Sequence, residues 1–141
     1  MTPSISTSLT DTRSTANTKM AKVVIKRNGI MRLLYTCKHT FTGLKWMCHN
    51  EAAFQQELML FLPLSIFACL ADVSVAKSAM LIVALLFVLF AELANTAIEV
   101  VVDRIGLEFD TLSGLAKDIA SAFVFLSMMM AAIVWWVILW A

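Results

Sequence analysis

The chain has 141 residues, of which 60% are hydrophobic, and its mean hydropathy is +0.83. This share exceeds that of soluble domains, and four glycines and two prolines are too few for the many turns of a membrane β-barrel, so helices in lipid are favoured. The net charge of +1 hides an asymmetry, because residues 1–50 carry eight of the eleven Lys and Arg and only one of the ten acids.

The first 50 residues divide into two regions by composition. Residues 1–19 are rich in Ser and Thr without an apolar stretch, which predicts a disordered polar tail. Residues 20–50 mix Lys and Arg with apolar and aromatic side chains, a composition typical of an amphipathic helix at a membrane interface. A nucleic-acid partner is disfavoured, because the rest of the chain has the composition of a membrane protein.

Three apolar stretches follow, at residues 58–71, 78–91 and 119–141. Fourteen residues of helix cover only about 21 Å, so the first two stretches cross the roughly 30 Å core only with their polar extensions, residues 51–57 and 92–103. The third stretch is long enough alone. These stretches predict an all-α membrane protein in which residues 51–141 form a domain of three transmembrane helices.

The charge asymmetry predicts the orientation of these helices. Basic segments stay in the cytoplasm, so the N-terminus is expected there and three spans leave the C-terminus outside. A predicted loop from Arg104 to Lys117 then returns to the cytoplasmic side. Acids from before the first span, at residues 51 and 57, are therefore expected at the same depth as residues 92–103 and the pair Lys117–Asp118.

The extension of the second span carries Glu92, Asn95, Glu99 and Asp103 on one helical stripe about 80° wide. Acids at membrane depth cost about 2–3 kcal/mol each, so a narrow stripe of them indicates a use. Carboxylates favour hard ions such as Mg²⁺, often completed by substrate phosphates, and a carboxylate without metal can act as a general base. Phosphoryl transfer to a lipid, ion or proton conduction, and structural packing all fit this pattern.

Known soluble nucleotide-binding signatures do not explain the stripe, since the sequence contains neither a P-loop nor the glycine loop of protein kinases. The stripe, Glu92-Leu-Ala-Asn-Thr-Ala-Ile-Glu-Val-Val-Val-Asp103, instead resembles the signature of the prokaryotic diacylglycerol kinase family. The likeness continues in residues 50–57 and 112–118 and covers about residues 31–141. It implies a homotrimer in the bacterial inner membrane, with a cytoplasmic N-terminus, a periplasmic C-terminus and active sites shared between subunits.

The resemblance also implies an activity, the ATP-dependent phosphorylation of diacylglycerol to phosphatidic acid, with undecaprenol as the alternative substrate within the family. Glu92 would be the general base and Asn95 would orient the reacting groups. Glu51 and Glu99 would hold the Mg²⁺ that bridges the ATP phosphates. Two interpretations of Asp103 remain open. It forms an ion pair, with Arg104 or with Lys117, or it has a catalytic role.

Two further sets of residues follow from the resemblance. The residues expected to bind ATP are Arg32, His39, Glu51, Glu99, Glu108, Asp110, Lys117 and Asp118. The residues expected to bind the lipid are Glu92, Ser121, Gln55 and Glu57. The chain departs from the family at four positions. Family members commonly have a basic residue where this chain has Gln55 and Leu115, a Tyr where it has His39, and a Trp where it has Cys48.

Overall fold

The computed structural model of the chain describes residues 29–106, 108 and 110–140. This part consists of four helices without a strand, namely α2 (Ile30–Asn50), α3 (Ala52–Leu70), α4 (Val75–Ile105) and α5 (Thr111–Trp140). The predicted all-α class is confirmed. The tail of residues 1–19 and the first part of the basic region lie outside the described residues, and the interfacial placement of α2 stays a prediction.

Three of these helices, α3, α4 and α5, are long and apolar enough to cross a membrane. Because α3 begins at Ala52 and α4 continues to Ile105, both polar extensions are helical, as the predicted spans require. Pro63 lies inside α3 without ending it, which membrane helices tolerate. The 31 residues of α4 are about 46 Å long, more than the hydrocarbon core of a bilayer.

The predicted loop from Arg104 to Lys117 is wrong in its bounds. The connection between α4 and α5 comprises only residues 106–110, and α5 begins eight residues before the predicted start of the third span. Asp110 begins this helix, because its Oδ1 accepts hydrogen bonds from the backbone N–H of Leu112 at 3.0 Å and of Ser113 at 2.9 Å. A hydropathy criterion detects only the apolar part of such a helix.

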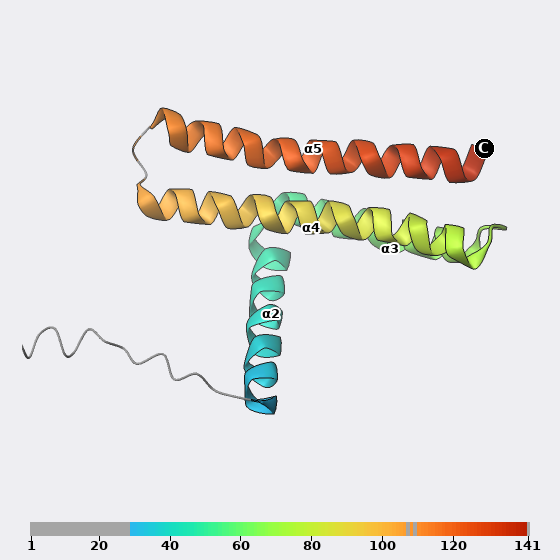
Figure 1. Cartoon of the computed structure of the whole chain (residues 1–141), viewed down its shortest axis with the longest axis horizontal. Coiled ribbons are helices and arrows are strands. Elements are labelled where there is room, and N and C mark those ends of the chain that lie inside the picture. Colours follow the sequence, from blue (N-terminus) through green and yellow to red (C-terminus); the bar gives the residue numbers. More distant parts are fainter. Residues whose placement is uncertain (1–28, 107, 109, 141) are drawn as a thin grey trace, which may run out of the picture. The chain divides into compact units, whose positions relative to one another are not determined.

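The helix α4 packs against both other long helices, and Figure 1 shows α5 alongside α4 and α3 behind it. Near the end of α5, the indole Nε1 of Trp135 donates a hydrogen bond to the carbonyl oxygen of Leu81 at 3.2 Å. The Trp135 ring also stacks on Phe67 of α3, with 6.1 Å between ring centroids. All three helices are therefore joined at the end remote from the α4–α5 connection.

Candidate active site

The polar residues predicted on one stripe all lie in α4 and become more exposed toward its C-terminus. Glu92 and Asn95 are buried, with 4% and 8% of their surface exposed, whereas Glu99 is half-buried and Asp103 is exposed. Residues three or four apart share a helix face, so the stripe runs from the packed part of the helix to its solvated end. One face thus offers carboxylates in environments of different polarity.

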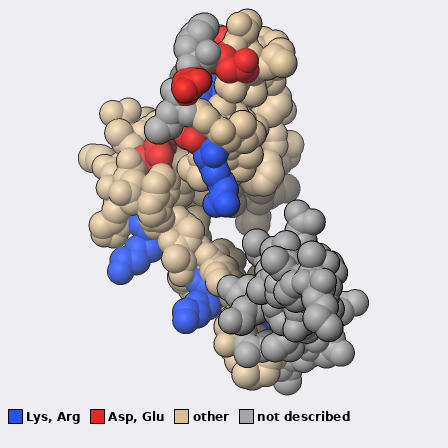
Figure 2. Space-filling model, turned by 90° about the vertical axis from the view of Figure 1, so that its left-hand side faces the viewer, with Lys and Arg blue, Asp and Glu red and all other residues tan. Residues whose placement is uncertain are grey.

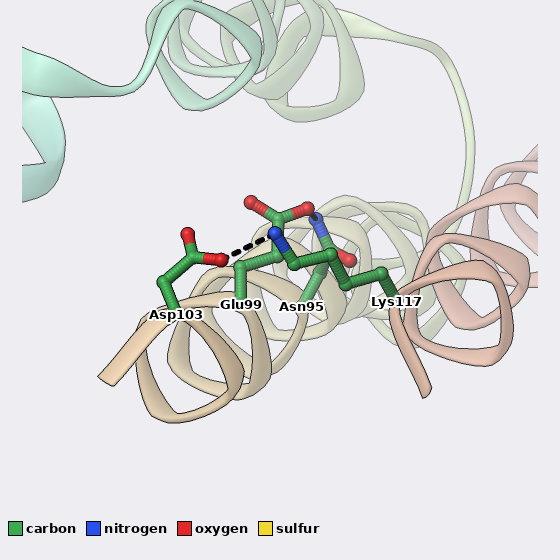
Figure 3. Close-up of polar contacts among 4 residues, drawn as sticks. All are labelled: Asn95, Glu99, Asp103 and Lys117. Atoms are coloured by element: carbon green, nitrogen blue, oxygen red, sulfur yellow. Dashed lines mark hydrogen bonds and ion pairs between the residues drawn. The ribbon is translucent and has the colours of Figure 1, made fainter. Parts of the chain in front are cut away.

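Asn95 holds the carboxylate of Glu99 within this stripe. Its Nδ2 donates a hydrogen bond to Glu99 Oε1 at 3.2 Å (Figure 3). The Oδ1 of the same amide is buried and has no hydrogen-bond partner among the described residues. Because a buried polar atom without a partner is costly, this oxygen is available to a bound ligand.

Carboxylates of α3 join those of α4, as expected. The charges of Glu99 and Glu51 both act on Glu92, and the charge of Glu92 acts on Glu57. Glu51 occupies the N-cap position of α3, yet its side chain makes no cap hydrogen bond. Its carboxylate is therefore not used by the helix. The antiparallel packing of α3 on α4 brings these four acids, the carboxylate cluster, to one end of the helix pair.

A second polar group lies between α4 and α5, where Lys117 Nζ forms an ion pair with Asp103 Oδ1 at 2.5 Å (Figure 3). Both residues line a pocket of about 200 Å³, the hairpin pocket, which also includes Glu108 and Asp110. Lys117 acts electrostatically on Glu99 as well, so the pocket adjoins the carboxylate cluster. Figure 2 shows acidic side chains, with Lys and Arg among them, gathered at this end of the helices.

Three other predicted site residues lie at the surface of the helices. Asp118, Gln55 and Ser121 are exposed and do not line the hairpin pocket. The hydroxyl of Ser121 donates to the carbonyl oxygen of Lys117 at 3.1 Å within α5. Arg32 and His39 belong to a separate unit, residues 1–39, so their expected contact with the nucleotide stays a prediction.

Sequence reasoning missed one polar residue beside the cluster. Thr96 is 4% exposed, and its buried hydroxyl has no hydrogen-bond partner in the described part of the chain. It lies about 40° from Glu92 around the helix, just beyond the edge of the predicted stripe. Its burial depends on the packing of α4, which the spacing of polar residues does not reveal.

The donor atoms fit a magnesium ion that arrives with a nucleotide. Among residues 29–106, 108 and 110–140, no group of three or more His, Cys, Asp or Glu side chains could hold a metal ion by itself. Glu51 and Glu99 nevertheless offer hard carboxylate oxygens, and the charge of each acts on Glu92. Mg²⁺ commonly binds to one or two carboxylates and takes its other ligands from water and substrate phosphates, so two acids suffice.

The fold and the site together define a helical membrane protein with a carboxylate and lysine site at one end of its helices. The family described as prokaryotic diacylglycerol kinase matches residues 38–139, and the chain belongs to this family. It is 40% identical over 113 residues to the diacylglycerol kinase of Escherichia coli strain K12, a match that covers 80% of this chain and 93% of that protein. The expected family is thereby confirmed, and the chain is a membrane kinase.

Two further relatives support the same assignment. The diacylglycerol kinase of Haemophilus influenzae is 39% identical over 113 residues, covering 78% of this chain and 93% of that protein. The diacylglycerol kinase of Pseudomonas aeruginosa is 37% identical over 113 residues, a match that covers 80% of this chain and 92% of that protein. Each match spans nearly the whole relative, and the family match at residues 38–139 extends over nearly all of the three long helices.

Proposed function

We propose that the chain transfers the terminal phosphate of ATP to the primary hydroxyl of diacylglycerol, forming phosphatidic acid at the carboxylate cluster. The observation that carries this function is the convergence of Glu51, Glu92 and Glu99 beside Lys117 in a chain of this family. The named relatives are diacylglycerol kinases, which favours diacylglycerol over undecaprenol. The conducting and scaffold alternatives have no comparable support.

Glu92 is the proposed general base. It is the most buried acid of the stripe, and a diacylglycerol molecule presents its hydroxyl from the membrane. As the hydroxyl oxygen bonds to the terminal phosphorus, the bond from that phosphorus to the bridging oxygen of ADP breaks and Glu92 takes the hydroxyl proton. Asn95 would orient the reacting groups through its free Oδ1 while its Nδ2 holds Glu99.

Glu51 and Glu99 are the proposed ligands of Mg²⁺, which when bound neutralises charge on the phosphate oxygens. Lys117, from the hairpin pocket, would counter further phosphate charge. The other proposed nucleotide contacts are Arg32, His39, Glu108, Asp110 and Asp118. The proposed lipid contacts, besides Glu92, are Gln55, Glu57 and Ser121.

Assembly as a homotrimer with shared sites, in the bacterial inner membrane, is part of the same proposal. Three helices alone are too few to enclose both a nucleotide and a lipid. The long helices also leave large apolar side chains exposed, for example Phe90 at 62% and Leu126 at 55%, which lipid or other subunits would cover. We place the N-terminus in the cytoplasm and the C-terminus in the periplasm.

Phosphate transfer from labelled ATP in mixed micelles tests the function, with diacylglycerol and undecaprenol assayed side by side. We expect labelled phosphatidic acid, and we expect Glu92→Gln to lower kcat by about 100-fold or more with little change in KM. Glu51→Gln and Glu99→Gln should each raise the Mg²⁺ and ATP concentrations required. Asp72→Asn, an exposed acid in the α3–α4 connection, is the control and should behave as wild type.

Three results would contradict the proposal. Preferential labelling of undecaprenol would reassign the substrate, and full activity of Glu92→Gln would remove the proposed base. Ion flux through proteoliposomes in the absence of ATP, together with no labelled lipid, would instead support the conducting alternative.

A further inference from the structure

The ion pair between Asp103 and Lys117 joins the polar ends of α4 and α5. Asp103 lies in the last turn of α4, and Lys117 lies in the second turn of α5, with residues 106–110 connecting the two helices. Their side chains meet at 2.5 Å across the wall of the hairpin pocket. Of the two partners expected for Asp103, the structure thus selects Lys117, and both residues of the pair line the hairpin pocket.

Lys117 has a second carboxylate within its electrostatic reach. Glu99 lies one helical turn before Asp103 on the same face of α4, and its charge also acts on Lys117. Figure 3 shows the Lys117 side chain extending past Glu99 to its bond with Asp103. A lysine side chain is long and flexible, so without Asp103 the ammonium group would be free to turn to Glu99.

A purely structural role explains this pair poorly. The side chains of Lys117 and Asp103 are 39% and 49% exposed, and ion pairs in such surroundings stabilise proteins only weakly. The two helices already pack against each other along α4, and Trp135 bonds to Leu81 at the far end. The packing of α4 against α5 therefore does not depend on this ion pair, whereas the position of the Lys117 ammonium group does.

We propose that Asp103 is a positioning residue that holds Lys117 in the hairpin pocket, directed at the nucleotide phosphates, and keeps it from neutralising Glu99. This inference rests on the proposed function, in which Lys117 faces phosphate and Glu99 binds Mg²⁺. In this role Asp103 acts on the nucleotide only through Lys117 and is not a ligand of the metal. It acts by deciding which carboxylate Lys117 pairs with, so that Glu99 keeps its charge for the metal.

The test is Asp103→Asn, which removes the charge and preserves the shape of the side chain. We expect KM for Mg-ATP to rise about 10-fold, with kcat within about 3-fold of wild type and KM for diacylglycerol unchanged. Displacement of a fluorescent ATP analogue, measured without lipid, should show the same loss of affinity and a higher Mg²⁺ requirement. Asp103→Glu should recover part of the affinity, and Asp72→Asn should lose none.

A double substitution separates positioning from stability. In a Lys117→Met background, Asp103→Asn should change nucleotide affinity less than 2-fold, because the residue that it positions is gone. The exchange Asp103→Lys with Lys117→Asp should keep the thermal stability of wild type without restoring nucleotide affinity. Restored affinity in that exchange would show a merely structural pair and overturn the inference.

The inference and the proposed function fail in different ways. A wild-type protein that labels no lipid contradicts the proposed function. A wild-type protein that labels diacylglycerol, combined with an Asp103→Asn variant that binds Mg-ATP as tightly as wild type, contradicts only the role of Asp103.

Discussion

The contact of Trp135 with Leu81 and Phe67 predicts a change in stability without a change in catalysis. Trp135→Phe removes the 3.2 Å hydrogen bond from Nε1 to the Leu81 carbonyl oxygen and keeps a ring near Phe67. Hydrogen bonds between membrane helices average about 0.6 kcal/mol and reach about 1.7 kcal/mol. Trp135→Ala also removes the stack, worth roughly 0.5–1.5 kcal/mol beyond the burial of the ring, so these two contributions alone sum to about 1–3 kcal/mol.

Thermal unfolding in detergent micelles measures these losses. A free-energy loss of 1 kcal/mol lowers Tm by roughly 2–8 °C in domains somewhat smaller or larger than this one, so we expect Trp135→Phe to lower Tm by a few degrees and Trp135→Ala to lower it further. Because Trp135 lies at the end of the helices remote from Glu92 and Lys117, kcat in the lipid assay should stay within about 2-fold of wild type.

Trp136 is the matched control for this experiment, since it is the neighbouring indole and is 64% exposed. Trp136→Phe should leave Tm within about 1 °C of wild type, because the Trp136 ring is mostly exposed and stacks on Trp140 of its own helix. Equal destabilisation by Trp136→Phe and Trp135→Phe, or no effect of either, would refute the argument that Trp135 joins the three helices.

Three further predictions concern single polar groups. Thr96→Val removes a buried hydroxyl without a partner, so Tm should stay equal or rise, and a loss of activity would reveal a bound ligand on that hydroxyl. Ser127, 1% exposed, bonds to Val124 in its own helix; Ser127→Ala should be nearly neutral in unfolding assays, whereas Ser127→Leu should cost about 1–3 kcal/mol by overpacking. The backbone N–H of Ser113 is the main cause that lowers the pKa of Asp110. The ionised Asp110 carboxylate therefore stabilises the fold at pH values above its pKa in the unfolded chain, and this contribution is lost as pH falls through its pKa in the folded protein. Lowering the pH should thus reduce the Tm of wild type more than that of Asp110→Asn.

The polar stripe of α4 was predictable because its cause is local. Helical spacing places Glu92, Asn95, Glu99 and Asp103 on one face whatever else the chain does, and an apolar stretch before them fixes the helix. The approach of Glu51 to this stripe was predictable for another reason. Successive membrane spans run in opposite directions, so the start of one helix must lie at the depth where the next one ends.

The contacts between helices were not predictable in the same way. Hydropathy locates an apolar segment but contains no information on how far a helix continues beyond it, so the start of α5 was placed at residue 119 instead of Thr111. The choice of Lys117 over Arg104 as the partner of Asp103 depends on the register between α4 and α5. That register is set by side-chain packing along both helices, including the Trp135 contact, and no single motif encodes it.

The length of α4 gives a physical reason for the proposed division of labour along the stripe. A bilayer core takes about 20 helical residues, whereas α4 has 31, so about 11 residues must extend beyond the hydrocarbon. If Val75 marks the far boundary, the near boundary falls close to residue 94, between Glu92 and Asn95. The proposed base would then lie at the depth of a lipid hydroxyl, and Glu99 and Asp103 would lie where water and nucleotide have access. The burial of these side chains also falls from Glu92 to Asp103, so the proposed base is packed against neighbouring helices whereas Asp103 is exposed near the end of α4.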